Sequence, residues 1–81
     1  MRRARIVDVS ELEPPRPLAV AVAALRELGD GQYLVVRHRR EPVPLYAMLT
    51  EMGFSYRVRE GAVTPIEVVI WASSDEPPVE A

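Results

Sequence analysis

Apolar and polar positions follow two different spacings along this chain. Alternation of apolar and polar residues, or a short apolar run, is typical of a strand. Segments of this kind lie at residues 5–9, 33–38, 54–59 and 66–72. Apolar residues recur at helical spacing in residues 17–28 and 44–52, and each of these stretches begins with a proline that suits a first helical turn. Gly29 and Gly53 are expected to end the two helices.

These elements predict a single α/β domain. Each strand–helix–strand unit prefers a right-handed crossover, which places both helices on the same face of the sheet. The last two strands are close enough in sequence to form a hairpin, so the sheet is mixed. We therefore predict a two-layer α/β sandwich with a four-stranded sheet, order βαβαββ, over residues 1–72. Residues 73–81 contain two prolines and three acidic residues, and we expect a flexible tail there.

Composition narrows the function classes. The 81 residues include ten basic and twelve acidic side chains, and the net charge of −2 argues against non-specific nucleic-acid binding. All basic residues are arginine, which excludes Schiff-base chemistry on lysine. The lack of cysteine excludes thiolate catalysis, disulfides and cysteine metal sites. No apolar run is long enough for a signal peptide or a membrane span, so we expect a cytoplasmic protein.

The junction between the first strand and the first helix is rich in proline. Residues 7–9 (Val-Asp-Val) are followed by Leu12 and by residues 14–18 (Pro-Pro-Arg-Pro-Leu). This pattern resembles the opening of the SirA/TusA-like proteins, in which a strand ending in Leu-Asp leads to Gly-Leu-x-Cys-Pro-x-Pro at the head of the first helix. Further similar residues are Gly31, Leu34, Val35, Val36, Pro42 and Gly53. The resemblance covers roughly residues 6–72 and implies the same two-layer sandwich.

One position separates this chain from the sulfur-carrying members of that group. The cysteine that carries a persulfide in those members aligns with Pro14, which has no nucleophile, so we expect no sulfur transfer. Together with residues 40–46 (Arg-Glu-Pro-Val-Pro-Leu-Tyr), the junction resembles a cysteine-free sister group, the domain of unknown function 2249 family. Some members of that group occur beside or fused to hemerythrin-like domains, or near denitrification genes. The resemblance thereby implies a link to iron or nitrogen-oxide biology.

The densest polar cluster lies between the second strand and the second helix, at residues 37–41 (Arg-His-Arg-Arg-Glu). Ligands of open α/β sheets bind outside the carboxyl ends of strands, near helix N-termini that attract anions. If the first two strands are parallel neighbours, Arg16 at the start of the first helix converges with Arg39 and Arg40 on one small anion. The alternative is a solvated loop on which these arginines pair with the nearby glutamates, Glu11, Glu13 and Glu41.

His38 and Tyr46 complete the candidate site. His38 is either a structural residue at a strand end or, in an alternative hypothesis, a ligand of iron or haem, with a dimer supplying a second imidazole. Tyr46 either contacts a ligand at this loop or covers the edge of the core. No nucleophile or acid–base pair has a catalytic spacing, so we predict that the protein is not an enzyme. The candidate binding residues are therefore Arg16, His38, Arg39, Arg40, Glu41 and Tyr46.

The strand alternation also predicts an apolar strip on the face of the sheet without helices. If Val68 and Ile70 face the helices, then Val69 and Trp71 face the other way, and Val35 joins them. A contiguous exposed apolar patch marks an interface, and tryptophan is a common anchor of interfaces. We therefore predict these three residues as contacts of a homodimer.

Two hypotheses for the function follow. In the first, the protein is a small non-catalytic binding or adaptor domain without a cofactor, and Arg16, His38, Arg39 and Arg40 contact an anionic ligand or a protein partner. In the second, it is a redox accessory domain that binds iron or haem through His38. Neither hypothesis involves nucleic acid or a membrane.

Overall fold

The predicted elements form, with small shifts at their ends. The computed structural model describes residues 2–79. In chain order the elements are β1 (Arg3–Asp8), α1 (Arg16–Arg26), β2 (Gln32–His38), α2 (Val43–Met52), β3 (Phe54–Glu60) and β4 (Ile66–Ala72). The α2 helix ends as expected, because Gly53 adopts the left-handed backbone (φ 86°) that glycine tolerates at a helix stop. The α1 helix ends before Gly29, because the N–H groups of Glu27 and Leu28 bond to carbonyls only three residues back.

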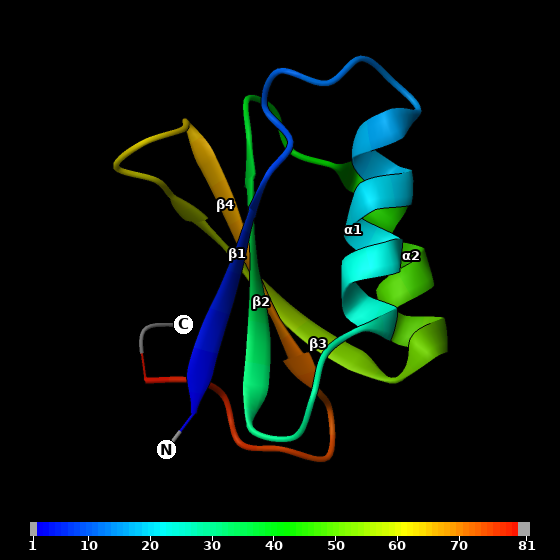
Figure 1. Cartoon of the computed structure of the whole chain (residues 1–81), viewed down its shortest axis with the longest axis vertical. Coiled ribbons are helices and arrows are strands. Elements are labelled where there is room, and N and C mark those ends of the chain that lie inside the picture. The colour runs from blue at the N-terminus through cyan, green and yellow to red at the C-terminus, as the bar shows by residue number, and fades with distance from the viewer. Residues whose placement is uncertain (1, 80–81) are drawn as a thin grey trace.

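The strands form one mixed sheet in the order β1-β2-β4-β3. The β1 and β2 strands are parallel, whereas β4 runs antiparallel to both β2 and β3. Both helices lie on the same side of this sheet (Figure 1). The expected two-layer α/β sandwich with the order βαβαββ is therefore confirmed. No helix in the described part of the chain is long and apolar enough to span a membrane.

The main core fills the space between the sheet and the two helices. The central strands β2 and β4 supply its floor, and the inner stripes of α1 and α2 supply its cover. Its most deeply buried large side chains are Val9, Leu34, Val36, Leu45, Leu49, Val68 and Ile70. Met48 and Met52 pack against this cluster from α2, which agrees with the helical spacing of the sequence.

The opposite face of the sheet carries a second, smaller cluster. Val35, Val69 and Trp71 pack with Tyr33 and are only 4%, 0% and 5% exposed. The expectation that these three residues form an exposed strip was wrong, because the chain itself covers them. Their part in a homodimer stays a prediction. On this face Ile6 is a large apolar residue that remains open to solvent, with 51% of its surface exposed.

The segment that we predicted as a flexible tail runs along this same side of the molecule (Figure 1). Within residues 73–79, Pro78 is buried. The Arg2 guanidinium donates a hydrogen bond to the backbone carbonyl of Glu76 and lies 5.6 Å from the ring centroid of Tyr33. These contacts join the tail, β1 and β2 at one end of the sheet. Residues 80 and 81 of the predicted tail lie outside the described residues.

Charged side chains occupy the other end of this face. Glu67 of β4 is only 5% exposed and lies between Arg37 of β2 and Arg59 of β3, with nitrogen–oxygen distances of 3.1 and 2.9 Å. Burial alone would raise the pKa of Glu67, but the hydrogen bonds and charges of the two arginines outweigh it and hold that pKa below its ordinary value. We call these three residues the Glu67 cluster.

Candidate binding site

Both helices begin at the same end of the sheet. Because β1 and β2 are parallel neighbours, their carboxyl ends lie side by side, and the β1–α1 and β2–α2 loops meet beyond them (Figure 1). Each helix also starts with the same short pattern, Pro-Arg-Pro-Leu at 15–18 and Pro-Val-Pro-Leu at 42–45. The condition under which we expected the two loops to share one site is therefore met.

The two helix starts offer few free N–H groups to a ligand. Each N-cap is a proline, without a side-chain cap, and Pro17 and Pro44 remove one N–H from each first turn. The N–H groups of Arg16 and Val43 already donate to nearby backbone carbonyls, at 3.0 Å in both cases. The recognition of an anion by helix termini, which the sequence predicted, therefore has little support here. Side chains must supply the polar contacts.

A pocket of about 270 Å³ lies between the two helix starts. It is largely apolar, and five of its lining residues are prolines: Pro14, Pro15, Pro17, Pro42 and Pro44. Leu18, Ala21, Val36 and Leu45 extend the apolar wall toward the core. Three polar side chains complete the lining, namely His38, Arg40 and Glu41. The pocket thus joins the proline junction to the polar loop, and we call it the proline pocket.

His38 presents a hydrogen-bond donor at this pocket. Its Nδ1 accepts the backbone N–H of Arg40 at 3.2 Å. Burial, and next the positive charges of Arg39 and Arg40, lower the pKa of His38 below its ordinary value, so the ring is neutral at pH 7. A neutral ring whose Nδ1 is an acceptor carries its proton on Nε2. Within residues 2–79 this Nε2–H has no hydrogen-bond partner.

Tyr46 lies beside the pocket and not in its lining. Its hydroxyl donates to Glu41 Oε1 at 3.0 Å, and its ring stacks on Tyr56 with 4.5 Å between the centroids. Burial and the Glu41 carboxylate raise the pKa of Tyr46, so the phenol stays protonated. Of the two roles that the sequence predicts for Tyr46, contact with a ligand or cover for the edge of the core, the structure shows the second, because Tyr46 packs against the main core. Its hydroxyl also positions Glu41, which is part of the pocket lining.

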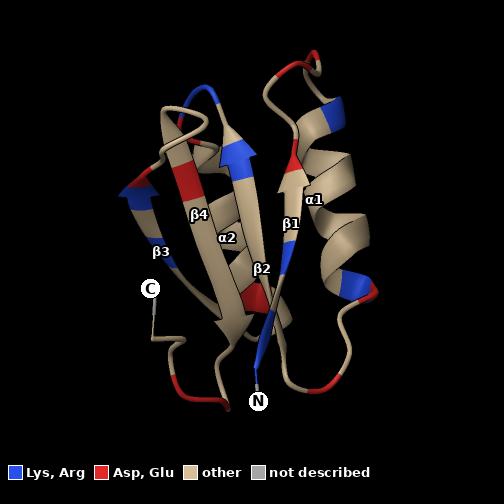
Figure 2. Ribbon diagram, turned by 60° about the vertical axis from the view of Figure 1, so that its left-hand side comes forward, with Lys and Arg blue, Asp and Glu red and all other residues tan. Residues whose placement is uncertain are grey.

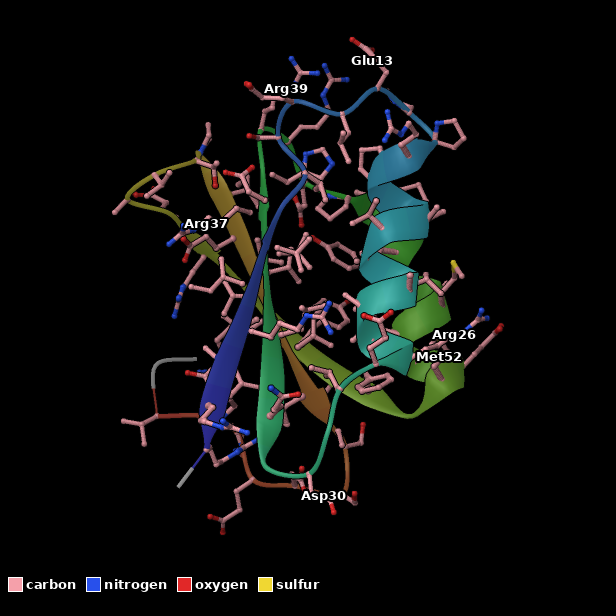
Figure 3. The ribbon with its side chains drawn as sticks, viewed as in Figure 1. Glu13, Arg26, Asp30, Arg37, Arg39 and Met52 are labelled. Carbon is pink, nitrogen blue, oxygen red and sulfur yellow. The ribbon has the colours of Figure 1, made fainter. Side chains whose placement is uncertain are left out.

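Three arginines near the two helix starts are exposed, namely Arg16, Arg39 and Arg40. Within the described residues, Arg16, Arg39 and Arg40 form no ion pair, although Figure 2 shows acidic and basic residues on the same loops. Figure 3 shows Glu13 and Arg39 at the end where both helices begin. The pairing of these arginines with Glu11, Glu13 or Glu41, which was the alternative from the sequence, is not formed. Arg40 lines the proline pocket, whereas Arg16 and Arg39 lie outside its lining.

The structure does not favour a metal or haem at His38. A histidine that binds a metal through Nε2 usually donates its other ring N–H to an acceptor. Here Nδ1 accepts a backbone N–H, which leaves the proton on the nitrogen that would have to bind the metal. Among residues 2–79, no group of three or more histidine, cysteine, aspartate or glutamate side chains is arranged to hold a metal ion. The residues present therefore do not fit the iron or haem alternative.

Comparison with known proteins identifies the family. The model of a family described as "Uncharacterized conserved protein (DUF2249)" matches residues 6–72. The chain belongs to this family. Among solved structures, the DUF2249 chain is similar to the crystal structure of a SirA-like protein from Desulfitobacterium hafniense, with 27% sequence identity and a TM-score of 0.69 over 84% of this chain and 95% of the other. No curated protein matches the sequence. The resemblance inferred from the proline junction is therefore confirmed.

Sequence reasoning found the polar part of the site but not the pocket. His38, Arg40 and Glu41 stood out because a polar run directly follows an apolar strand. The prolines were interpreted as residues that start helices, which they also are. The repeated Pro-x-Pro-Leu pattern at 15–18 and 42–45 was the available signal that both helix starts would present similar apolar walls.

Proposed function

We propose that this DUF2249 protein is a small non-catalytic binding domain that recognises an anionic ligand where its two helices begin. One observation carries this proposal: Arg40, which is exposed and forms no ion pair within the described residues, lines a pocket formed by both helix starts, and Arg16 and Arg39 on the same two segments form no ion pair either. Elsewhere in the described chain, Arg5, Arg37 and Arg59 each have a carboxylate partner, whereas Arg3 and Arg26 form no ion pair but do not line the proline pocket. Unpaired guanidinium groups are suited to bind carboxylate or phosphate oxygens.

The lining of the proline pocket supports binding rather than catalysis. It contains no hydroxyl, thiol or amine that could act as a nucleophile. His38 has no carboxylate to orient it, since its Nδ1 is occupied by a backbone N–H. The chain has no cysteine, so it cannot carry a persulfide as sulfur-carrier proteins do. These features favour an adaptor or sensor role over an enzymatic one.

Titration of the isotope-labelled full-length protein tests this proposal. Inorganic phosphate, nitrite and a glutamate-rich peptide are added separately, and backbone and His38 ring resonances are followed by NMR. We expect saturable shifts at Arg39, Arg40 and His38 for at least one probe, which weaken as salt is added. The proposal fails if none of these probes moves a resonance near His38.

A matched pair of variants locates the binding. Replacing Arg39 and Arg40 together by alanine should weaken the binding of the responding probe without changing the unfolding midpoint, since both side chains are exposed and unpaired. Arg26→Ala is the control, because Arg26 is exposed near the opposite end of α1 (Figure 3). Equal losses in the two variants would indicate a general effect of charge and contradict a site at the helix starts.

A further inference from the structure

The volume and the apolar walls of the proline pocket are not accounted for by an anion that binds to the arginines alone. Its volume of about 270 Å³ lies just below the ~300–1,000 Å³ of small-molecule sites, and its walls are apolar side chains from both loops and both helices. A simple inorganic anion would leave these walls uncovered. The pocket therefore fits a ligand that has a compact apolar body as well as a polar group.

The polar lining specifies the kind of group at the head of that ligand. His38 Nε2–H and the Arg40 guanidinium are donors without partners in the described chain. The one carboxylate in the lining belongs to Glu41, and Tyr46 already donates to its Oε1. Donors predominate over free acceptors, so the head group is an acceptor, and the charge of Arg40 favours an anionic one.

We propose that the proline pocket binds a free small-molecule carboxylate with a compact branched or cyclic apolar body. The body occupies the space between the proline walls and Leu18, Val36 and Leu45, and the carboxylate accepts hydrogen bonds from His38 Nε2–H and Arg40. This inference rests on the proposed function and assigns its ligand class. The negative charge of Glu41 opposes the carboxylate, and Arg40 in the same lining balances that charge. Arg16 and Arg39 are likewise matched in number by Glu11 and Glu13, so the hydrogen bonds from His38 and Arg40, and not an excess of positive charge, hold the carboxylate.

Three probes distinguish the contribution of the apolar body to binding from that of the carboxylate head group. 4-Methylpentanoate carries both, 4-methylpentan-1-ol carries the body without the charge, and acetate carries the charge without the body. In NMR titrations of the full-length protein, 4-methylpentanoate should shift the methyl resonances of Leu18, Val36 and Leu45 and the His38 ring. The other two probes should bind at least about tenfold more weakly, because the alcohol lacks the carboxylate and acetate lacks the apolar body.

A matched pair of variants tests the assigned contact. Arg40→Met keeps a long side chain but removes its charge, and it should weaken 4-methylpentanoate binding by about tenfold. Arg26→Met makes the same change at the far end of α1 and should leave binding unchanged (Figure 3). His38→Phe, which keeps a ring without the donor, should cause a similar loss to Arg40→Met. Chemical denaturation of each variant shows whether the fold is intact.

Three results would overturn this inference. The alcohol could bind as well as the acid, the shifts could spare the three pocket methyl groups, or a leucine-ending peptide could bind while 4-methylpentanoate does not. In each case, shifts at Arg39 and Arg40 caused by phosphate, nitrite or the acidic peptide would leave the broader proposal standing. If these anions also cause no shift, the two proposals fail together.

Discussion

On one side of the sheet, two helices cover the apolar residues; on the other side, no helix does, and yet Tyr33, Val35, Val69 and Trp71 are buried there. The helix side has a large core, and the proline pocket lies where both helices begin. The other side combines a small apolar cluster around Trp71 with the tail at one end and the Glu67 cluster at the other. Packing of two helices leaves a small apolar pocket at their shared start, whereas the tail leaves a wider pocket of about 790 Å³ against the helix-free face, lined by Arg2, Gly31, Tyr33 and residues 75–79.

The largest expected effect tests whether the helix-free face is truly part of the core. Trp71→Ala should lower the free energy of unfolding by about 3–5 kcal/mol, because it removes a large side chain that is only 5% exposed. Urea denaturation followed by circular dichroism measures this, since the variant loses its tryptophan fluorescence. Ile6→Ala, at a half-exposed position of the same face, should cost about 1 kcal/mol or less. A Trp71 loss as small as that of Ile6 would mean that the tail does not close this face.

The second test concerns the helix side. Leu49→Ala should cost about 2–5 kcal/mol, because Leu49 is fully buried between α2 and the sheet. Trp71 fluorescence in urea follows the unfolding. Val43→Ala is the control on the same helix, since Val43 is 63% exposed and its truncation should cost about 0.5 kcal/mol or less. If Leu49→Ala costs far less than Trp71→Ala, the helix layer contributes less to stability than the structure indicates.

The two faces also differ in how far the sequence could predict them. Alternation placed Trp71, Val69 and Val35 on the correct face, and the short sequence separation of the last two strands correctly predicted the β3–β4 hairpin. It could not predict their burial, because that depends on contacts between distant segments, such as Arg2 with Tyr33 and with Glu76. A local pattern shows which face a residue occupies but not what covers that face.

The candidate site shows the same division. The polar loop was visible as a run of residues after a strand, but the pocket arises from two loops that are brought together by the parallel pairing of β1 and β2. The Glu67 cluster was also missed, although a glutamate inside an apolar strand was a signal. Its partners Arg37 and Arg59 could be found only once the strand order β2-β4-β3 was known.

The third test addresses the ion pairs that close the helix-free face. Glu67→Gln should cost about 1–2 kcal/mol at pH 7, because it removes the charge from two hydrogen bonds to partly exposed guanidinium groups. The matched control is Glu27→Gln, which affects the exposed pair with Arg5 and should cost well under 1 kcal/mol. Equal costs would show that burial of Glu67 adds nothing to its pairing.

The pH dependence of the stability difference between wild type and Glu67→Gln gives a second measurement. The pKa of Glu67 is lower in the folded protein than its ordinary value of 4.5, so its contribution to stability is present above that pH and is lost as pH falls through the lowered pKa. The difference between wild type and Glu67→Gln should therefore shrink in acid. Some acid dependence remains in the variant, because hydrogen bonds from Ser10 also lower the pKa of Asp8.

The smallest expected effect belongs to His38 on the helix side, and it begins at a higher pH than the effect of Glu67. Burial and the neighbouring arginines lower its pKa below 6.5, so the folded state favours the neutral ring. Its contribution to stability is therefore present above pH 6.5 and is lost as pH falls through the lowered pKa. This loss begins below pH 6.5, whereas that of Glu67 begins below pH 4.5. NMR titration of the His38 ring measures that pKa directly.

Replacing Arg39 and Arg40 together by glutamine should raise the pKa of His38 toward its ordinary value, because two nearby positive charges are removed. The same change should leave the acid range governed by Glu67 unaltered, since that carboxylate pairs with Arg37 and Arg59 on the other face. A His38 pKa at or above 6.5 in the wild type would mean that the ring is more solvated than the pocket geometry indicates. If both pH ranges shift together in the double variant, the two faces are electrostatically coupled through the sheet and cannot be treated as separate sites.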